Sequence, residues 1–399
     1  MFHLLLVIIY LSFISLGLPD ALLGSAWPTM YHEFQVPVSY AGVVSMIISC
    51  GTIVSSLQSD RLTRKLGPGK VTALSVAMTA IALFGFSTSH SFPLLCLWAI
   101  PYGLGAGSVD AALNNYVALH YESHHMSWLH CMWGLGASVG PYIMSYALID
   151  GQGWNMGYTY IAILQIVLTA ILLFSLPLWK THAMASESST AEIAKALSIP
   201  EILAIPGAKA VLIMFFCYCA LESTAGLWAS SFLVLFHGLD ADTAAGFASL
   251  FYVGITVGRG INGFIAMKLN DTQMIRLGQS IIGIGVLLLL LPLGRFSALA
   301  GLITIGLGCA PIYPCVIHST PEHFGADKSQ ALIGVQMACA YTGSLLMPPL
   351  FGLIANHIST ALYPVYLLAI LILMTFMHET LLKQTRFVKI LSKYSKFFQ

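Results

Sequence analysis

Charged side chains are scarce in this sequence. Asp, Glu, Lys and Arg make up 8% of its 399 residues, whereas a soluble domain is typically about one quarter charged. Hydrophobic residues account for 57% of the chain. Because so few polar side chains cannot cover a surface that faces water, the composition excludes a soluble globular protein and indicates an integral membrane protein in a lipid bilayer.

A large excess of charge of one sign is also lacking. The formal net charge is +1, so the chain has no basic field for nucleic acid, and no such partner is predicted. The eight cysteines lie in apolar runs and form no Cys-x-x-Cys pair. This argues against a disulfide framework, and no metal or other cofactor is predicted. No Lys or Arg precedes the first apolar stretch, so a cleaved signal peptide is not expected.

Long apolar runs recur along the chain. A spanning helix needs about 20 mostly apolar residues, because the hydrocarbon core of a bilayer is about 30 Å thick. No strand pattern is strong enough for a closed barrel, so the spans are expected to be helical. Twelve runs meet the requirement, at residues 4–32, 38–58, 71–89, 93–119, 127–149, 158–179, 209–236, 243–267, 273–294, 297–318, 328–355 and 359–378.

The twelve runs fall into two groups of six around a polar stretch. We therefore predict an all-α membrane protein with twelve transmembrane helices in two six-helix bundles. The predicted segments are an N-terminal bundle at 1–179, a cytoplasmic linker at 180–207, a C-terminal bundle at 208–380 and a basic cytoplasmic tail at 381–399. Within the linker, Thr190–Leu197 has the composition of a short amphipathic helix.

The distribution of Lys and Arg predicts the orientation. If both termini lie on one side, the loops of that side hold all the basic residues outside the spans except Arg295. Loops rich in Lys and Arg stay in the cytoplasm. Both termini are therefore expected on the cytoplasmic side of a multi-pass protein in the cell (inner) membrane.

The two halves of the sequence echo one another at an offset of about 200 residues. Such repeats are how many transporters build a site near the midplane of the bilayer. The glycines among the matching residues are expected to let helices approach closely. The matching features are Asp20 with Glu222, Gly103-Leu104-Gly105 with Gly306-Leu307-Gly308, and Gly140-Pro141 with Pro348-Pro349.

Residues 56–65 read Ser-x-x-x-Asp60-Arg61-x-Thr-Arg64-Lys. This pattern resembles the signature of the major facilitator superfamily, G-x-x-x-D-R-x-G-R-R/K. Three further stretches are similar to the fucose–proton symporter branch, whose fourth helix carries G-x-x-E-x-x-x-N and whose seventh carries E-x-x-x-G. They are Gly107-Ser-Val-Asp110-Ala-Ala-Leu-Asn114, Glu222-Ser-Thr-Ala-Gly226 and Ala310-Pro311-Ile-Tyr313-Pro314.

The resemblance implies a two-bundle fold that works as a monomer by alternating access. Its central cavity would be lined by the first, fourth, seventh and tenth spans. Asp60, Arg61 and Arg64 would form a cytoplasmic clasp that stabilises one conformation. The first span departs from the branch, since Gly17-Leu-Pro19-Asp20 stands where an Asn-rich acidic stretch is usual.

Three acidic residues, Asp20, Asp110 and Glu222, lie well inside apolar runs. Each charge at mid-bilayer costs at least about 2.5–3.5 kcal/mol, so these acids must be neutral, paired or wetted. They lie on three of the four spans that would line the family's cavity, which favours a proton-coupling role. Glu222 is either a second titrating group or a direct acceptor for the hydroxyl groups of a solute. The alternatives are structural: a hydrogen bond between Asp110 and Asn114, a buried pair of Glu222 with Arg259, and a bend of the first span at Asp20.

Arg259 is the only basic residue deep in a span. An unpaired buried Arg is costly, so a carboxylate or a helix C-terminus is the expected partner. A structural ion pair is the favoured interpretation, and a gating or substrate role is the alternative.

Polar and aromatic side chains on the spans are candidate solute contacts. A sugar suits them, because its C–H face stacks on rings while its hydroxyls bond to amides. Trp and Tyr also form interfacial belts and pack between helices, which is the alternative for each ring. His130 is either a packing residue or a titrating group. The candidates are Asn114, Asn115, Trp133, Trp228, Tyr313, Gln336 and Tyr341.

The leading hypothesis is a secondary active transporter that couples protons to the uptake of a neutral polar solute such as a monosaccharide. A proton-coupled efflux antiporter for drugs or metabolites is the alternative. Gly136-x-x-x-Gly140-Pro141 resembles the exporter signature, although Met144 and Ser145 stand where it has a Gly pair. Sodium coupling stays open. No catalytic residue and no enzyme are predicted, because the acids lie singly, without His or Cys at ligand spacing.

Overall fold

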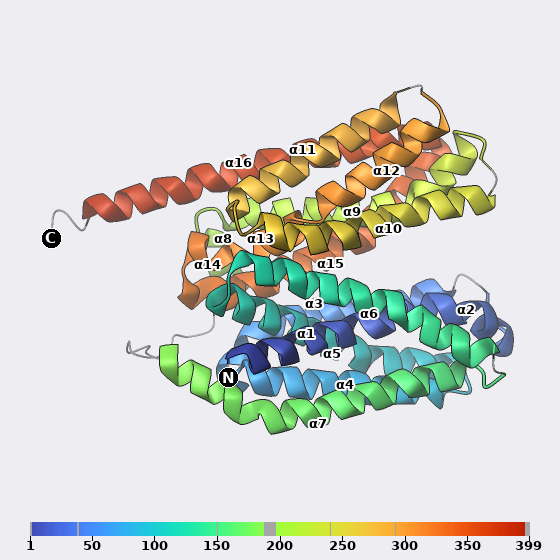
Figure 1. Cartoon of the computed structure of the whole chain (residues 1–399), viewed down its shortest axis with the longest axis horizontal. Coiled ribbons are helices and arrows are strands. Elements are labelled where there is room, and N and C mark those ends of the chain that lie inside the picture. Colours follow the sequence, from blue (N-terminus) through green and yellow to red (C-terminus); the bar gives the residue numbers. More distant parts are fainter. Residues whose placement is uncertain are drawn as a thin grey trace. The chain divides into compact units, whose positions relative to one another are not determined.

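The computed structural model describes residues 2–37, 40–149, 151–186, 197–239, 241–291 and 293–395. Within these ranges the regular structure is helical (Figure 1). The helix predicted at Thr190–Leu197 lies outside the described residues, except for Leu197, which is not helical.

The helices follow one another with short connections. In chain order they are α1 (Phe2–Asp20), α2 (Leu22–Glu33), α3 (Ala41–Leu66), α4 (Pro68–Ser87), α5 (Phe92–His120), α6 (Ser123–Ile149), α7 (Trp154–Ser186), α8 (Ile199–Ala204), α9 (Ala208–Leu235), α10 (Ala241–Ile265), α11 (Asp271–Leu290), α12 (Arg295–Cys309), α13 (Ile312–His318), α14 (Thr320–Phe324), α15 (Ala326–His357) and α16 (Tyr363–Ser395), with a short 3-10 helix, η2 (Thr360–Leu362), before α16.

Ten helical segments in the described part of the chain are long and apolar enough to cross a membrane. Each of the twelve predicted runs overlaps a helix, but the runs at 127–149 and 243–267 are not among the ten. The corresponding helices are less hydrophobic, because α6 is rich in Gly and Ser and α10 contains Arg259 and Asn262. The protein is a multi-pass membrane protein, and the count of twelve spans stays a prediction.

Three predicted spans are clearly longer in the structure than their apolar runs. The helix α7 continues past residue 179 to Ser186, so residues 180–186 of the predicted linker are helical. The helix α3 continues past residue 58 to Leu66, and it ends at Gly67, whose φ of 81° favours glycine. The helix α16 continues past residue 378 to Ser395, so the described part of the basic tail is helical. Lys and Arg are good helix formers, and a helix does not have to end where its apolar run ends.

Two other predicted spans are interrupted. The first breaks between α1 and α2, directly after Pro19 and Asp20. The run at 297–318 breaks between α12 and α13, at Ala310 and Pro311. Proline lacks the N–H that continues a helix and its ring clashes with the preceding turn, which accounts for both positions.

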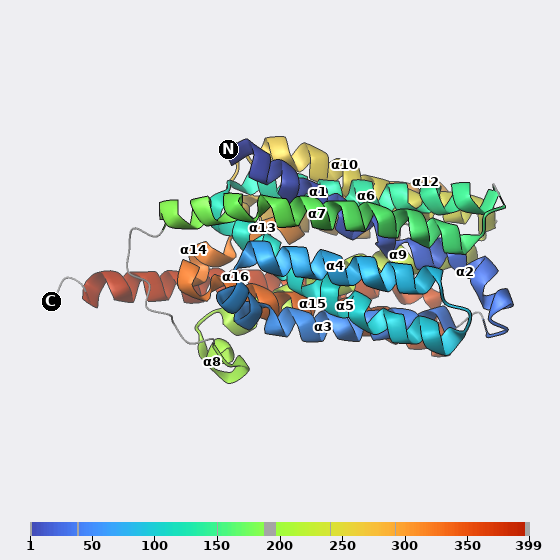
Figure 2. The ribbon, with the colours of Figure 1, turned by 90° about the horizontal axis from the view of Figure 1, so that it is seen from below.

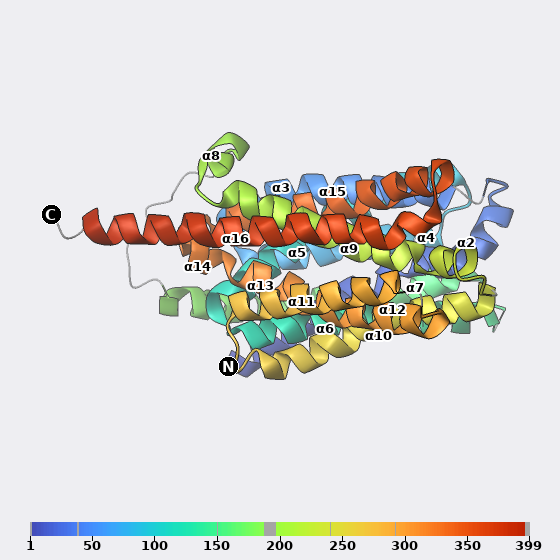
Figure 3. The same ribbon diagram turned by 90° about the horizontal axis from the view of Figure 1, so that it is seen from above.

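The chain divides into two compact units. Unit 1 consists of Met1–Tyr116 and Leu129–Ala196, and unit 2 of Val117–Trp128 and Leu197–Gln399. The predicted bundle at 1–179 therefore differs from unit 1 in two places. Unit 1 lacks the segment Val117–Trp128, where α5 ends and α6 begins, and it includes residues 180–196, which were predicted as linker. In unit 1, α4 packs along α7 (Figure 2). In unit 2, α16 packs along α9 and α11 (Figure 3).

Glycines confirm the expected close approach of helices, and they do so alike in both units. In unit 1, a Cβ added to Gly103 would lie 2.3 Å from the carbonyl oxygen of Ile48 on α3. In unit 2, a Cβ added to Gly306 would lie 2.2 Å from the carbonyl oxygen of Phe251 on α10. Gly105 and Gly308 meet the next helix in each unit, α4 and α11. The repeated Gly-Leu-Gly motif thus corresponds to equivalent helix packing in the two units.

Candidate functional site

The site in unit 1 depends on the close packing of α1 against α6. A Cβ at Gly17 would lie 2.1 Å from the carbonyl oxygen of Trp133, and one at Gly136 would lie 2.0 Å from that of Ile14. Only glycine allows two helices to approach so closely. The packing brings the end of α1 beside the side chains of α5 and α6.

Asp20, the last residue of α1, receives hydrogen bonds from two helices. The indole N–H of Trp133 on α6 donates to Oδ2 at 2.8 Å, and the hydroxyl of Tyr102 on α5 donates to Oδ1 at 3.2 Å. Both donors are neutral. Asp20 is exposed and Trp133 is half-buried, so this carboxylate and one aromatic ring are accessible together.

Asp110 belongs to a second, buried network. The amide nitrogen of Asn114, one turn later on α5, donates to Oδ1 of Asp110 at 2.8 Å and to its backbone oxygen at 2.9 Å. On α6, Nε2 of His130 lies 3.0 Å from Oδ1 of Asn114. Asp110, Asn114 and His130 are 8%, 0% and 5% exposed. Three polar side chains thus form a chain across two helices.

The donors in this chain follow from the chemistry of the groups. Asp110 offers two oxygens to Asn114, so the amide nitrogen must face Asp110 and the amide oxygen must face His130. An amide oxygen only accepts, so Nε2 of His130 carries the hydrogen. His130 also packs edge-on against Phe13 at 5.4 Å between ring centroids. The imidazole is therefore fixed in both position and tautomer.

In unit 2, the intramembrane acid Glu222 lies beside a basic side chain. Nη2 of Arg259 on α10 lies 3.6 Å from Oε1 of Glu222 on α9, and their side chains are 4% and 21% exposed. The expected carboxylate partner of Arg259 is therefore Glu222. Tyr218, one turn before Glu222, donates to the carbonyl oxygen of Cys309 at 3.0 Å. The pair sits against buried aromatic and backbone groups of the same unit.

The remaining candidates in unit 2 are engaged in packing. Trp228 donates through Nε1 to the carbonyl oxygen of Pro348 at 2.9 Å. The hydroxyl of Tyr313 contacts the sulfur of a methionine, Met337, at 3.1 Å. Gln336 is fully buried and accepts a hydrogen bond from Thr320 at 3.1 Å. These contacts favour the structural alternative.

Asn115 and Tyr341 complete the set of predicted solute contacts. Asn115 is 7% exposed on α5, directly after the Asp110–Asn114 network. Tyr341 is half-buried on α15.

Two of the three residues of the expected clasp are paired on a single helix. Nε of Arg64 lies 2.9 Å from Oδ1 of Asp60, one turn earlier on α3. Arg61 is exposed. An i,i+4 pair of this kind stabilises the end of its own helix.

The sequence reasoning missed a polar cluster in unit 2. Nδ1 of His318 lies 2.6 Å from Oδ2 of Asp271, and its Nε2 lies 3.1 Å from the backbone oxygen of Tyr121. The hydroxyl of Ser123 donates to Oδ1 of the same Asp271. These residues stand at helix ends, where polar side chains are common, so no pattern singled them out. Tyr102 was missed as well, although it lies two turns before Asp110 on the same helix.

Residues 9–348 match the family model of the Major Facilitator Superfamily. The chain belongs to this superfamily. The membership suggested by residues 56–65 is therefore confirmed.

Among curated relatives, the chain is similar to Bypass of stop codon protein 6 of Saccharomyces cerevisiae, with 24% identity over 66% of this chain and 57% of that protein. The chain thus spans little more than half of the yeast relative. It is also similar to the Glucose/mannose transporter GlcP of Bacillus subtilis, with 22% identity over 77% of each chain.

Solved structures share the fold. The fucose:proton symporter FucP of E. coli aligns with a TM-score of 0.69 and 15% identity, covering 94% of this chain and 98% of that one. The proton:xylose symporter XylE aligns with a TM-score of 0.73 and 12% identity, covering 94% of both chains. A human organic anion transporter aligns with a TM-score of 0.74 and 13% identity, covering 94% and 98%. The family and fold are those of membrane transporters.

Proposed function

We propose that this protein is a secondary active transporter that couples proton movement to the uptake of a neutral polar solute, most simply a monosaccharide. The observation that carries the proposal is the Asp110–Asn114–His130 chain in unit 1. Lys and Arg are absent from residues 1–60 and 71–179, so within the first 179 residues they occur only at the end of α3 and the start of α4. The hydrogen-bonded chain itself consists of a carboxylic acid, an amide and an imidazole, and the acid and the imidazole are groups that can exchange a proton.

The proposed proton site is the Asp110 carboxyl group. Oδ1 accepts from Asn114, so a proton on Oδ2 leaves that hydrogen bond intact. Loading a proton removes a charge that is costly inside a membrane, and releasing the proton restores it. His130 positions Asn114 through its own N–H and, as an imidazole, can hold a second proton. Loading and release thereby change the free energy of the buried unit.

The proposed solute contact in unit 1 is the accessible pair of Asp20 and Trp133. The carboxylate accepts hydrogen bonds from hydroxyl groups, and the indole ring offers a face on which a sugar ring can stack. In unit 2, Glu222 is the candidate, because its side chain is 21% exposed beside the buried Arg259. The similarity of the chain to the glucose/mannose transporter GlcP, the fucose:proton symporter FucP and the proton:xylose symporter XylE supports a sugar as the solute.

The proposal includes the arrangement expected from the sequence. Twelve transmembrane helices in two bundles, with both termini in the cytoplasm and the chain in the cell (inner) membrane, would work by alternating access as a monomer. The polar cluster of Asp271 and His318 would then lie on the cytoplasmic side of unit 2.

An efflux antiporter is the alternative function. Its support was the glycine pattern of α6, and that pattern has a packing explanation. Cβ atoms at Gly136 and Gly140 would each lie 2.0 Å from a backbone oxygen of α1, those of Ile14 and Leu18. The pattern therefore follows from the contact of α1 with α6 and does not distinguish export from uptake.

A ligand panel followed by a transport assay tests the proposal. Purified protein in detergent is heated with neutral monosaccharides, organic anions or lipophilic cations, and a bound ligand raises the melting temperature. A sugar that raises it is then supplied to proteoliposomes with an inward proton gradient, an inward sodium gradient or neither. Uphill accumulation that requires the proton gradient supports the proposal. Stabilisation by lipophilic cations alone, or accumulation driven by sodium alone, would contradict it.

A further inference from the structure

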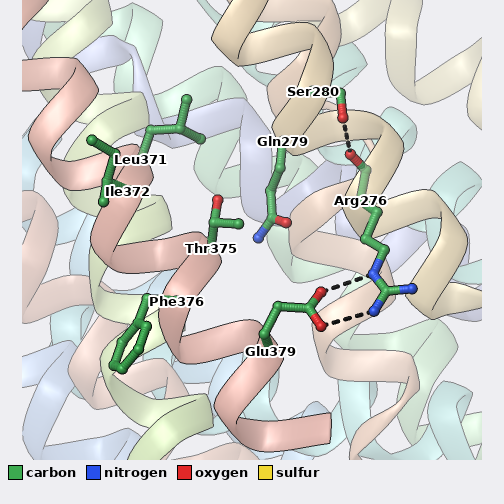
Figure 4. A pocket seen from close by; sticks show the side chains of 8 residues that line it. All are labelled: Arg276, Gln279, Ser280, Leu371, Ile372, Thr375, Phe376 and Glu379. Atoms are coloured by element: carbon green, nitrogen blue, oxygen red, sulfur yellow. Dashed lines mark hydrogen bonds and ion pairs between the residues drawn. The ribbon is translucent and has the colours of Figure 1, made fainter.

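An open groove of about 540 Å³ lies between α11 and α16 of unit 2, and none of the residues that line it belongs to the sites described above. Figure 4 shows polar side chains from α11 facing a mixed surface of α16. The lining residues are Arg276, Gln279, Ser280, Leu371, Ile372, Thr375, Phe376 and Glu379.

One end of the groove carries both charges. Nε and Nη2 of Arg276 each lie 2.8 Å from a carboxylate oxygen of Glu379 (Figure 4). The two side chains are 54% and 40% exposed. A guanidinium has five N–H donors, so three remain after this bidentate pair, and the carboxylate keeps further lone pairs. The pair can still bind both an anion and a hydrogen-bonding cation.

Gln279 supplies an independent sign that the groove takes a polar ligand. The residue is 5% exposed, and its Nε2 has no hydrogen-bond partner among the described residues. Figure 4 shows its side chain reaching from α11 into the space next to Thr375 and Glu379. An amide N–H₂ that is buried without an acceptor is unfavourable. An acceptor from outside the chain would satisfy it.

The rest of the groove is apolar and open. Phe376 and Ile372, one and two turns before Glu379 on α16, are 62% and 60% exposed. Along α16 the lining changes from the charged Glu379 to the apolar Phe376 and Ile372. This change takes about 11 Å, or two helical turns. This order matches a phospholipid, which has a charged headgroup above acyl chains. Lys383, exposed one turn beyond Glu379, marks the aqueous end.

We propose that the groove binds a phospholipid whose headgroup carries a primary ammonium. The phosphate accepts hydrogen bonds from Arg276 and from Nε2 of Gln279, and the ammonium donates to Glu379. An acyl chain lies along Ile372 and Phe376. A purely anionic headgroup would face the negative charge of Glu379, and a quaternary ammonium has no N–H to donate, so both fit less well.

Lipid retention by the full-length protein tests this proposal. The protein is purified in detergent and mixed with equal amounts of phosphatidylethanolamine, phosphatidylcholine and phosphatidylglycerol. The bound lipid is then measured by native mass spectrometry. Wild-type protein is expected to retain phosphatidylethanolamine about tenfold better than phosphatidylcholine, as one charged hydrogen bond predicts. Equal retention of these two lipids would overturn the proposal, and so would a preference for phosphatidylglycerol.

Three variants locate the effect. Gln279→Leu keeps the volume of the side chain, removes the buried amide and is expected to lower retention of phosphatidylethanolamine about tenfold. Glu379→Gln removes the negative charge and is expected to shift the preference to phosphatidylglycerol. Arg295→Gln is the matched control, because Arg295 is exposed at the start of α12 and lines no part of the groove. If Gln279→Leu behaves like Arg295→Gln, lipid binds elsewhere and the assignment is wrong.

Discussion

The two units hold their intramembrane acids in opposite ways. In unit 1, Asp20 accepts hydrogen bonds from the neutral side chains of Trp133 and Tyr102. Asp110 accepts one from the neutral amide of Asn114. In unit 2, Glu222 faces Arg259, whose guanidinium is buried. A neighbouring cation favours the ionised form of an acid more strongly than neutral donors do. Under the proposed function, proton exchange therefore belongs to unit 1 and the ion pair to unit 2.

The contrast also shows what a weak internal repeat preserves. Asp20 and Glu222 occupy matching positions in the two halves, and the glycines around the fourth and tenth spans pack alike. The partners of the two acids do not match. The repeat therefore keeps the helix packing while the chemistry of each half has diverged.

Substitution of Asp110 is the largest expected effect. Asp110→Asn removes the proposed proton site and keeps a side chain of the same shape. Uphill accumulation of solute in proteoliposomes is expected to disappear, while exchange of labelled for unlabelled solute continues, because exchange needs no net proton movement. The matched control is Asp327→Asn, an exposed aspartate at the start of α15. Uphill accumulation at the wild-type rate by Asp110→Asn would remove the contrast between the units.

Substitution of Glu222 is expected to act first on stability. Glu222→Gln leaves the buried Arg259 without its carboxylate. The free energy of unfolding should fall by about 3 kcal/mol, the lower end of the values for broken buried pairs. The melting temperature should fall, and solute affinity should fall with it. A double variant, Glu222→Gln with Arg259→Met, should recover much of the stability. A double variant no more stable than the single one would show that the ion pair is not the reason for the loss.

His130 tests whether the network of unit 1 acts as one. His130→Phe keeps a ring against Phe13 but leaves the buried amide oxygen of Asn114 without a donor, which costs about 1–3 kcal/mol. The pH dependence of transport between about pH 5 and 8 should change, since histidine is the side chain that titrates there. An unaltered pH profile, with the melting temperature lowered, would make His130 a packing residue only.

Trp133 is expected to give the smallest effect. Trp133→Phe removes the N–H bonded to the accessible Asp20 and keeps an aromatic ring, which costs about 0.5–1.5 kcal/mol. Solute affinity should weaken several-fold in the thermal-shift titration. Trp179→Phe is the control, because Nε1 of Trp179 bonds to Ser175 on the same helix, α7. Equal losses in both variants would place the effect in packing instead of binding.

Much of the scaffold was predictable from the sequence, because it follows from properties of single segments. Hydropathy located the helices, the proline at Pro311 explains why one span is split, and glycine spacing indicated the close helix contacts. The ends of α3, α7 and α16 were missed, because the apolar run ends before the helix does. The superfamily was identifiable from ten residues near Asp60.

The partners of the acids were only partly predictable. Asn114 lies one turn from Asp110, so that bond could be proposed from spacing. The bonds of Trp133 to Asp20 and of His318 to Asp271 join helices far apart in the chain. Such pairs depend on how two helices are rotated against each other, which no single segment encodes. The pairing of Arg259 with Glu222 could be proposed from the sequence, because the spans contain few acidic residues that could be its partner.

The eight cysteines offer a route to observing the molecule at work. All lie within the described residues, and among them only Cys50, on α3, is exposed, while the others are buried or half-buried. A thiol reacts with maleimides only where the reagent can reach it. Cys50 lies within the candidate span Ala41–Leu66 and lines an apolar groove, so an apolar, membrane-permeant maleimide should attach there first in the unmodified chain. The natural sequence already carries a spectroscopic reporter on α3, whose brightness can be followed while candidate solutes are added.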